Sequence, residues 1–157
     1  MRERVFLQVE DTEMDALLLK IEFTRHPELL RIWVRDGQEA IDYLLGEQPY
    51  NDRKEFPLPD IILLDLKMPR LSGFDFLKWR REAAPEDLRI IPVIIMSGSN
   101  LPEDVHRAYA LGANRYMVKP SDPSTLRQQF TSLVENWCEY TELVERGAPG
   151  RLPGVSG

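Results

Sequence analysis

Three acidic residues in this sequence stand directly after apolar runs, where the ends of strands would bring them together. Glu10 and Asp11 close the run at 4–9, and Asp65 closes the continuously apolar run at 61–64. Two like charges about 4 Å apart repel by about 4 kcal/mol at an effective dielectric of 20, so such a cluster needs a cation or a shared proton. Oxygen ligands favour a hard ion, which makes Mg²⁺ the expected occupant and Mn²⁺ its substitute.

An acidic helix start explains the first two acids equally well, because the helix dipole favours negative charge there and Thr12 and Asp15 have capping-box spacing. Asp65 is harder to explain in this way. A carboxylate that closes a buried strand loses hydration unless something pairs with it. Asp65 is therefore a candidate nucleophile, since a carboxylate can attack phosphorus and form an aspartyl phosphate.

A hydroxyl and a lysine close two further apolar runs. Ser97 follows residues 93–96, and Lys119 follows residues 115–118. Ser97 would donate a hydrogen bond, and Lys119 would supply a cation, to the oxygens of a transferred phosphoryl group. Taken alone, Lys119 is more typical of an exposed surface lysine.

The elements that must position these residues alternate along the chain. Strands are predicted at 4–9, 31–35, 61–64, 93–96 and 115–118, and apolar residues at helical spacing follow each of them. Such alternation implies right-handed crossovers, and hence a parallel sheet with helices on both faces. We predict the flavodoxin-like strand order 2-1-3-4-5, with ligands bound at the carboxyl ends of the strands.

The last helix is predicted to be unusually long. It begins near Asp122, and its apolar spacing continues to Val144. Residues 1–146 would then form one domain with an extended last helix. Residues 147–157 are rich in Gly and Pro, which predicts a disordered tail. Residues 46–59 are predicted to be a surface loop.

The composition excludes several classes of protein. Hydrophobic residues make up 43% and charged residues 29% of the 157 residues, a balance typical of a globular domain. The net charge of −6 argues against nucleic acid as a partner. There is neither an apolar run of membrane-spanning length nor the apolar core of a signal peptide, so no membrane partner is expected. The lone Cys138 suits a reducing, cytoplasmic location.

The order and spacing of these motifs resemble the receiver domains of two-component response regulators. The resemblance covers residues 4 to about 135, and the motifs are weak singly but specific as a set. The matching motifs are Glu10-Asp11, Asp60 to Pro69 followed by Ser72-Gly73, Ser97-Gly98, and Gly112 to Pro120.

The resemblance implies a role for each matching acid. Asp65 resembles the phosphoacceptor, which takes a phosphoryl group from the phosphohistidine of a partner kinase. Asp11 and Asp65 would bind Mg²⁺ directly, together with the backbone carbonyl of Lys67. Glu10 would act more often through water.

The resemblance also implies a switch. Ser97 resembles the hydroxyl residue that moves to the phosphoryl oxygens, and Lys119 resembles the lysine that pairs with them. Tyr116 resembles the aromatic residue that then turns inward; without the resemblance it would be interpreted as an ordinary half-buried strand aromatic. The peptide bond between Lys119 and Pro120 is expected to be cis.

Three functions fit this pattern. The first is a phosphorylation-dependent switch without an output domain, which is no enzyme beyond assisting its own phosphorylation and dephosphorylation. The second is a Mg²⁺-dependent phosphohydrolase, but enzymes that resemble haloacid dehalogenases carry a second Asp two residues after the nucleophile, where this chain has Lys67. The third is a degenerate docking module, which would be expected to lose the acids or the lysine. The first function is predicted.

The loop at 46–59 and the long last helix are similar to those of single-domain regulators paired with bacterial phytochromes. The predicted partners are therefore a sensor histidine kinase, with a bacterial phytochrome as a candidate, and a downstream protein or phosphotransfer partner. Apolar residues from Trp137 to Val144 predict a two-fold homodimer. Its face would combine the helix at 102–111, the strand at 115–118 and the last helix. In the alternative, the helical extension packs on its own sheet.

Overall fold

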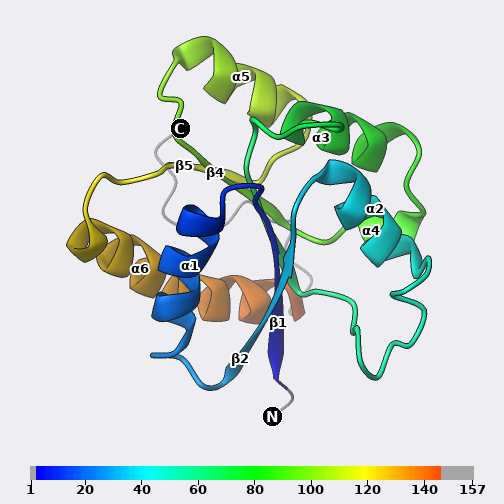
Figure 1. Cartoon of the computed structure of the whole chain (residues 1–157), viewed down its shortest axis with the longest axis horizontal. Coiled ribbons are helices and arrows are strands. Elements are labelled where there is room, and N and C mark those ends of the chain that lie inside the picture. Colours follow the sequence, from blue (N-terminus) through cyan, green and yellow to red (C-terminus); the bar gives the residue numbers. More distant parts are fainter. Residues whose placement is uncertain (1–2, 146–157) are drawn as a thin grey trace. The chain divides into compact units, whose positions relative to one another are not determined.

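The computed structural model describes residues 3–145, with side chains up to residue 137. Five parallel strands form one sheet in the predicted order β2-β1-β3-β4-β5 (Figure 1). One compact unit ends at Val118 and contains the whole sheet, and a second begins at Lys119 and contains the last helix. The strands are β1 (Arg4–Val9), β2 (Leu29–Val34), β3 (Ile61–Leu64), β4 (Val93–Ser97) and β5 (Arg115–Val118).

Five helices accompany the sheet in the first unit, and one long helix forms the second. They are α1 (Glu13–Phe23), α2 (Gly37–Leu45), α3 (Gly73–Glu82), α4 (Glu86–Arg89), α5 (Pro102–Ala110) and α6 (Pro123–Glu145). The extended last helix is confirmed, since α6 is continuous over 23 residues. The helix α4 was not predicted, because four residues are too few to show a helical period. No helix within residues 3–145 combines the length and apolar character needed to cross a bilayer.

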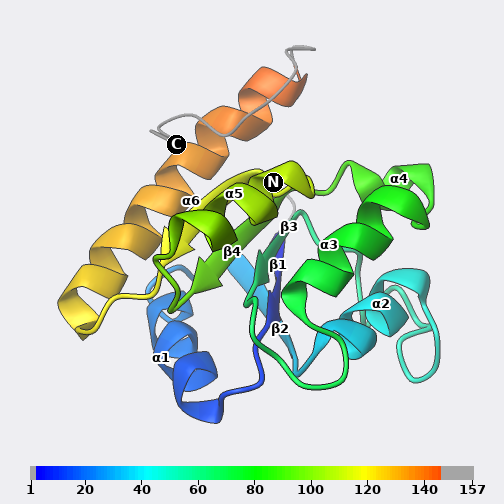
Figure 2. The same cartoon turned by 90° about the horizontal axis from the view of Figure 1, so that it is seen from above.

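The side chains of β1 alternate between two apolar layers. Leu7 belongs to a buried cluster that includes side chains of α2, α3 and α5. Phe6 instead contacts Phe23 of α1, with ring centroids 5.4 Å apart. Because successive side chains of a strand point to opposite faces, α1 covers one face of the sheet, and α2, α3 and α5 cover the other (Figure 2).

Residues 46–59 pack against α2 rather than extending away from it. The Arg53 guanidinium donates to the carbonyl oxygens of Tyr43 and Leu44, at 2.9 and 2.8 Å. The Tyr43 hydroxyl donates to the Pro57 carbonyl at 2.7 Å. Since the last carbonyl groups of a helix lack partners within the helix, Arg53 satisfies the end of α2 and fixes the loop to it.

The capping box that the spacing of Thr12 and Asp15 allowed at the start of α1 does not form. Thr12 makes no side-chain hydrogen bond to the helix, and its N–H instead donates to the Glu10 carboxylate at 3.4 Å. The Glu10 carboxylate thus accepts from the N–H that Asp15 would accept from in a capping box. A capping box does form at α3, where Ser72 accepts from the Asp75 N–H at 3.2 Å and Asp75 accepts from the Ser72 N–H at 3.3 Å.

Candidate functional site

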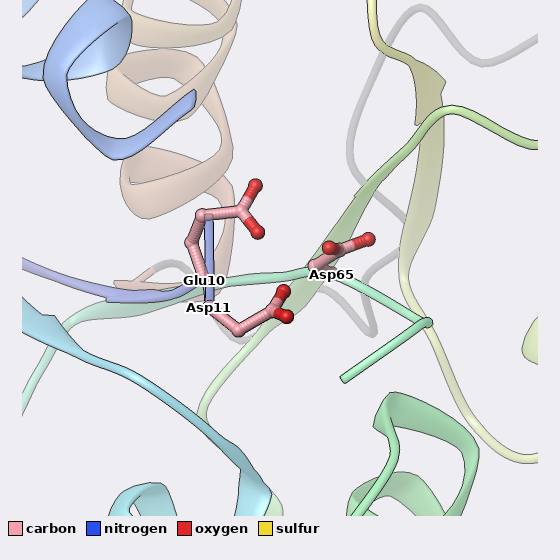
Figure 3. Close-up of side chains that lie close together, drawn as sticks. All are labelled: Glu10, Asp11 and Asp65. Carbon is pink, nitrogen blue, oxygen red and sulfur yellow. The ribbon is translucent and has the colours of Figure 1, made fainter. Parts of the chain in front are cut away.

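The three predicted acids lie together at the carboxyl ends of β1 and β3 (Figure 3). These strands pair in parallel with Val9 opposite Leu64, so the residues that follow reach the same edge of the sheet. One carboxylate oxygen of each acid lies within 4.8 Å of the others. Glu10 and Asp65 are buried, and Asp11 is half-buried.

The chemistry of this donor set suits a hard divalent cation. All three groups offer oxygen, and their partial burial makes the mutual repulsion of three carboxylates costly. Mg²⁺ is usually bound by one or two carboxylates while keeping several waters, and Mn²⁺ accepts the same ligands. The residues present therefore fit the predicted metal.

The acidic segment after β1 is held by β2. The Glu10 N–H donates to the Val34 carbonyl at 3.0 Å, and the Trp33 indole N–H donates to the Glu10 carbonyl at 2.8 Å. The Arg35 guanidinium lies over the Trp33 ring, 4.5 Å from its centroid. These contacts fix the peptide that joins Glu10 to Asp11. The sequence did not single out Trp33, whose one signal is an aromatic residue in the strand beside the acids.

Asp65 begins a tightly packed loop. Its N–H donates to the Val9 carbonyl at 3.1 Å, and its Oδ1 accepts from the Leu66 N–H at 2.8 Å. A Cβ atom at Gly73 would lie only 2.2 Å from the Asp65 carbonyl oxygen. Any larger residue at position 73 would therefore displace the loop that carries Asp65.

Ser97 closes β4 at the edge of the sheet where Asp65 lies. Ile95 is opposite Leu64 in the parallel register, so Ser97 stands two residues beyond the last pair of the ladder. Its side chain is buried, and its Oγ accepts from the Ser99 N–H at 3.1 Å. The predicted hydroxyl is thus at the expected edge and already hydrogen-bonded.

Tyr116 contacts the loop that follows Ser97. Its hydroxyl donates to the Ser99 carbonyl at 2.8 Å, and its N–H donates to the Tyr109 hydroxyl at 3.0 Å. The Ser99 hydroxyl donates to the Asp104 carboxylate at 2.5 Å. Ser99 therefore connects the two predicted switch residues, a connection that no local sequence pattern shows.

Lys67 and Lys119 are the remaining predicted site residues. Lys67 is exposed, two residues after Asp65. Lys119 directly follows β5, as predicted, and begins the second compact unit. Within residues 3–145 the cis peptide bond is Gln48–Pro49 rather than Lys119–Pro120, so the expected cis bond is wrong. At a peptide bond before proline the trans form is favoured by about 0.5–1 kcal/mol. Only the family resemblance argued for a cis bond at Lys119–Pro120.

Comparison with known proteins identifies the class to which this fold and site belong. The family described as response regulator receiver domain matches residues 6–131. The chain belongs to this family of two-component signalling proteins, in which aspartate phosphorylation and Mg²⁺ are general features.

Three relatives illustrate the similarity. The probable methanogenesis regulatory protein FilR2 of Methanothrix harundinacea is 34% identical over 134 residues, which cover 85% of this chain and 83% of FilR2. Response regulator Rcp1 of Synechocystis sp. is 30% identical over 144 residues, 89% of this chain and 92% of Rcp1. The Mn²⁺-bound form of Rcp1 superposes with a TM-score of 0.75, over 85% of this chain and 94% of that one. The phosphorylated cyanobacterial phytochrome response regulator RcpA, 31% identical, superposes with a TM-score of 0.77 over 87% and 94%.

Proposed function

We propose that this chain is a response regulator that accepts a phosphoryl group on Asp65 from the phosphohistidine of a sensor kinase. The observation that carries the proposal is the cluster of Glu10, Asp11 and Asp65, whose carboxylate oxygens lie within 4.8 Å. A carboxylate oxygen of Asp65 attacks the phosphorus as the bond from phosphorus to the histidine nitrogen breaks. The products are an aspartyl phosphate and the free imidazole of the kinase.

The acids would hold Mg²⁺, which would offset negative charge on the phosphoryl oxygens. Asp11 and Asp65 would be direct ligands, the backbone carbonyl of Lys67 would be a third, and Glu10 would act through water. Lys119 supplies a further cation to the phosphoryl oxygens. The donor chemistry of the cluster supports this assignment, as does the Mn²⁺-bound form of Rcp1.

Ser97 and Tyr116 form the switch in this proposal. The Ser97 Oγ accepts from Ser99, and the Tyr116 hydroxyl binds the carbonyl of the same residue. When Ser97 turns toward the phosphoryl group, its contact with Ser99 breaks and the loop that holds Tyr116 changes. Phosphorylation of Asp65 thereby changes a protein-binding face of the domain.

The chain assists only its own phosphorylation and dephosphorylation and acts on no other substrate. Lys67 supports this, because it stands where a phosphohydrolase of the haloacid dehalogenase kind has its second acid. The lone Cys138 fits a reducing, cytoplasmic location. The domain comprises residues 1–146; the tail predicted at 147–157 lies outside the described residues.

The kinase docks on α1. Met14, Leu17 and Ile21 are large apolar side chains that remain exposed, and their spacing places them on one side of the helix. An exposed apolar patch usually marks an interface, and this one begins three residues after Asp11. A donor that brings a phosphohistidine to Asp65 would have to approach this end of the sheet.

Phosphotransfer from purified, autophosphorylated histidine kinases tests both the proposed function and the docking of the kinase on α1. A panel that includes a bacterial phytochrome is appropriate, since RcpA is a phytochrome response regulator. One kinase should transfer its phosphoryl group to the wild type, and Leu17→Glu should slow that transfer at least tenfold without slowing labelling by acetyl phosphate. Equal transfer to both proteins would contradict docking on α1. Failure of every kinase together with failure of acetyl phosphate would contradict the function.

The homodimer predicted from sequence remains our proposal, through α5, β5 and α6. The dimer is supported by the position of β5 as an outermost strand of the sheet and by the exposed side chains of Leu101 and Val118. Of the apolar extension, the side chains from residue 138 onward lie outside the described residues. Sedimentation should show a dimer at tens of micromolar for the full chain and a monomer after truncation behind Glu135. A monomeric full chain, with and without beryllofluoride, would refute the dimer.

A further inference from the structure

We propose that Arg70 is a positioning residue, whose ion pair with Asp36 holds the loop after Asp65 in the conformation that binds metal. The inference rests on the proposed function, because it assigns a role toward the same Mg²⁺ site. Lys67, whose carbonyl is the proposed third ligand, lies between Asp65 and Arg70 in this loop.

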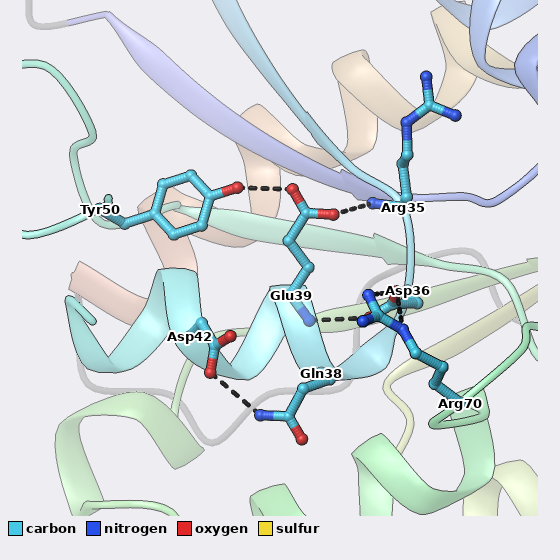
Figure 4. A network of polar contacts seen from close by, with 7 residues as sticks. All are labelled: Arg35, Asp36, Gln38, Glu39, Asp42, Tyr50 and Arg70. Atoms are coloured by element: carbon cyan, nitrogen blue, oxygen red, sulfur yellow. Dashed lines mark hydrogen bonds and ion pairs between the residues drawn. The ribbon is translucent and has the colours of Figure 1, made fainter. Parts of the chain in front are cut away.

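The ion pair joins the loop to the start of α2 (Figure 4). The Arg70 Nε donates to Asp36 Oδ2 at 2.9 Å, and the Arg70 Nη2 contacts the same oxygen. The other oxygen of Asp36 accepts from the Glu39 N–H at 2.9 Å and caps the helix. Only 5% of the Asp36 side chain is exposed, so removing its partner would leave a buried charge uncompensated.

The backbone at Arg70 is unusual. Its φ is 65°, and within residues 3–145 it is the only non-glycine residue with a positive φ. Glycine adopts this region at little cost and asparagine more readily than most residues, whereas an arginine there is strained. The strained backbone aims the guanidinium at Asp36, and this contact gives a physical reason for an arginine at the position.

Backbone contacts hold the loop on either side of Arg70. The Gly37 N–H donates to the Leu71 carbonyl at 3.1 Å, and a Cβ at Gly37 would lie 2.6 Å from that oxygen. The Gly73 N–H donates to the Leu66 carbonyl at 2.9 Å. The ion pair is therefore a polar side-chain contact in a junction that is also held by these backbone bonds and by the packing of Leu71 on the core.

The helix α2, which Asp36 caps, is itself held by contacts of Glu39. Glu39, which follows Asp36 in α2, accepts from the Tyr50 hydroxyl at 2.5 Å and from the Arg35 N–H at 2.9 Å (Figure 4). The start of α2 is thus tied both to the end of β2 and to the loop at 46–59. Arg70 therefore joins the loop after Asp65 to the start of α2, which these contacts hold in place.

Calorimetric Mg²⁺ titration of Arg70→Asn and Asp36→Asn tests the proposal. Asparagine relieves the strained φ at position 70, and at position 36 it keeps a helix cap while removing the charge. We expect each variant to bind Mg²⁺ about tenfold more weakly than the wild type, with no further loss in the double variant. If net charge alone mattered, Arg70→Asn would bind Mg²⁺ more tightly and only Asp36→Asn more weakly.

Stability separates positioning from a purely structural role. The double variant has neither a strained arginine nor an unpaired buried charge, so it should melt at or above the wild-type temperature while still binding Mg²⁺ weakly. Arg81→Gln removes another exposed guanidinium, from an ion pair within α3, and should leave Mg²⁺ affinity unchanged. Wild-type affinity in the double variant would overturn the proposal.

A second measurement needs no metal. Hydrogen exchange at the Gly73 amide, which bonds across the loop to Leu66, should be faster in metal-free Arg70→Asn than in the metal-free wild type. Unchanged exchange would also overturn the proposal. If the wild type binds no Mg²⁺ at all, the proposed function fails, while this exchange measurement still decides whether Arg70 holds the loop.

Discussion

The hydroxyl of Tyr116 donates a hydrogen bond of 2.8 Å to the backbone carbonyl of Ser99. The N–H of Ser99 donates to the Ser97 Oγ at 3.1 Å. Ser99 is therefore hydrogen-bonded both to the end of β4 and to β5. A movement of Ser97 can therefore reach Tyr116 without any large rearrangement of the sheet. In the proposed switch, this arrangement would couple the acidic site to β5.

Tyr116→Phe should lower the free energy of unfolding by about 1 kcal/mol, because it removes the donor to the Ser99 carbonyl. Mg²⁺ affinity should not change, since Tyr116 is not among the acids. Urea denaturation and calorimetry would check these outcomes. A variant of unchanged stability but altered metal affinity would show that Tyr116 acts in some other way.

Asp11→Ala should weaken Mg²⁺ binding at least tenfold, because it removes a proposed direct ligand. It also removes repulsion among carboxylates whose oxygens lie within 4.8 Å, so the metal-free variant should be at least as stable as the wild type. Thermal melts with and without Mg²⁺ measure both effects. A metal-induced shift equal to that of the wild type would exclude Asp11 as a ligand.

Trp33→Phe keeps an aromatic ring but removes the indole donor to the Glu10 carbonyl. We expect Mg²⁺ affinity to fall about tenfold, as when groups that orient a ligand are lost. Trp79→Phe, which alters a ring that packs on Phe76 in α3, is the matched control and should bind like the wild type. Equal affinities in the two variants would leave Trp33 a packing residue only.

The stability of the fold should decline in alkali. Burial raises the pKa of the Tyr43 hydroxyl to about 12, from 10.0. Because the folded pKa is the higher one, this contribution is complete below about pH 10 and is lost as the pH rises toward 12. Thermal melts between pH 8 and 11 should show a shallower decline for Tyr43→Phe than for the wild type. Parallel declines would contradict a protonated, buried Tyr43.

The predictable part of the fold is the part with a strong local pattern. The continuous apolar run at 61–64 is typical of a buried parallel strand, and Asp65 at its end marked the site. The sheet order then brought Asp65 beside Glu10 and Asp11, because neighbouring parallel strands end at one edge.

The features that escaped prediction join residues far apart in the sequence. Arg70 and Asp36 are 34 residues apart, and Trp33 and Glu10 are 23 apart, so neither contact leaves a periodic pattern. The spacing of Thr12 and Asp15 allowed a capping box, but the Thr12 N–H instead donates to the Glu10 carboxylate. Such contacts depend on side-chain geometry that only the assembled sheet determines.

The most direct test of the account is the intact mass of the protein after incubation with acetyl phosphate and Mg²⁺. The wild type should gain the mass of one phosphoryl group, Asp65→Asn should gain none, and EDTA should prevent the gain in the wild type. Equal labelling of the two proteins, or labelling that persists in EDTA, would contradict the assignment of Asp65 as a Mg²⁺-dependent phosphoacceptor.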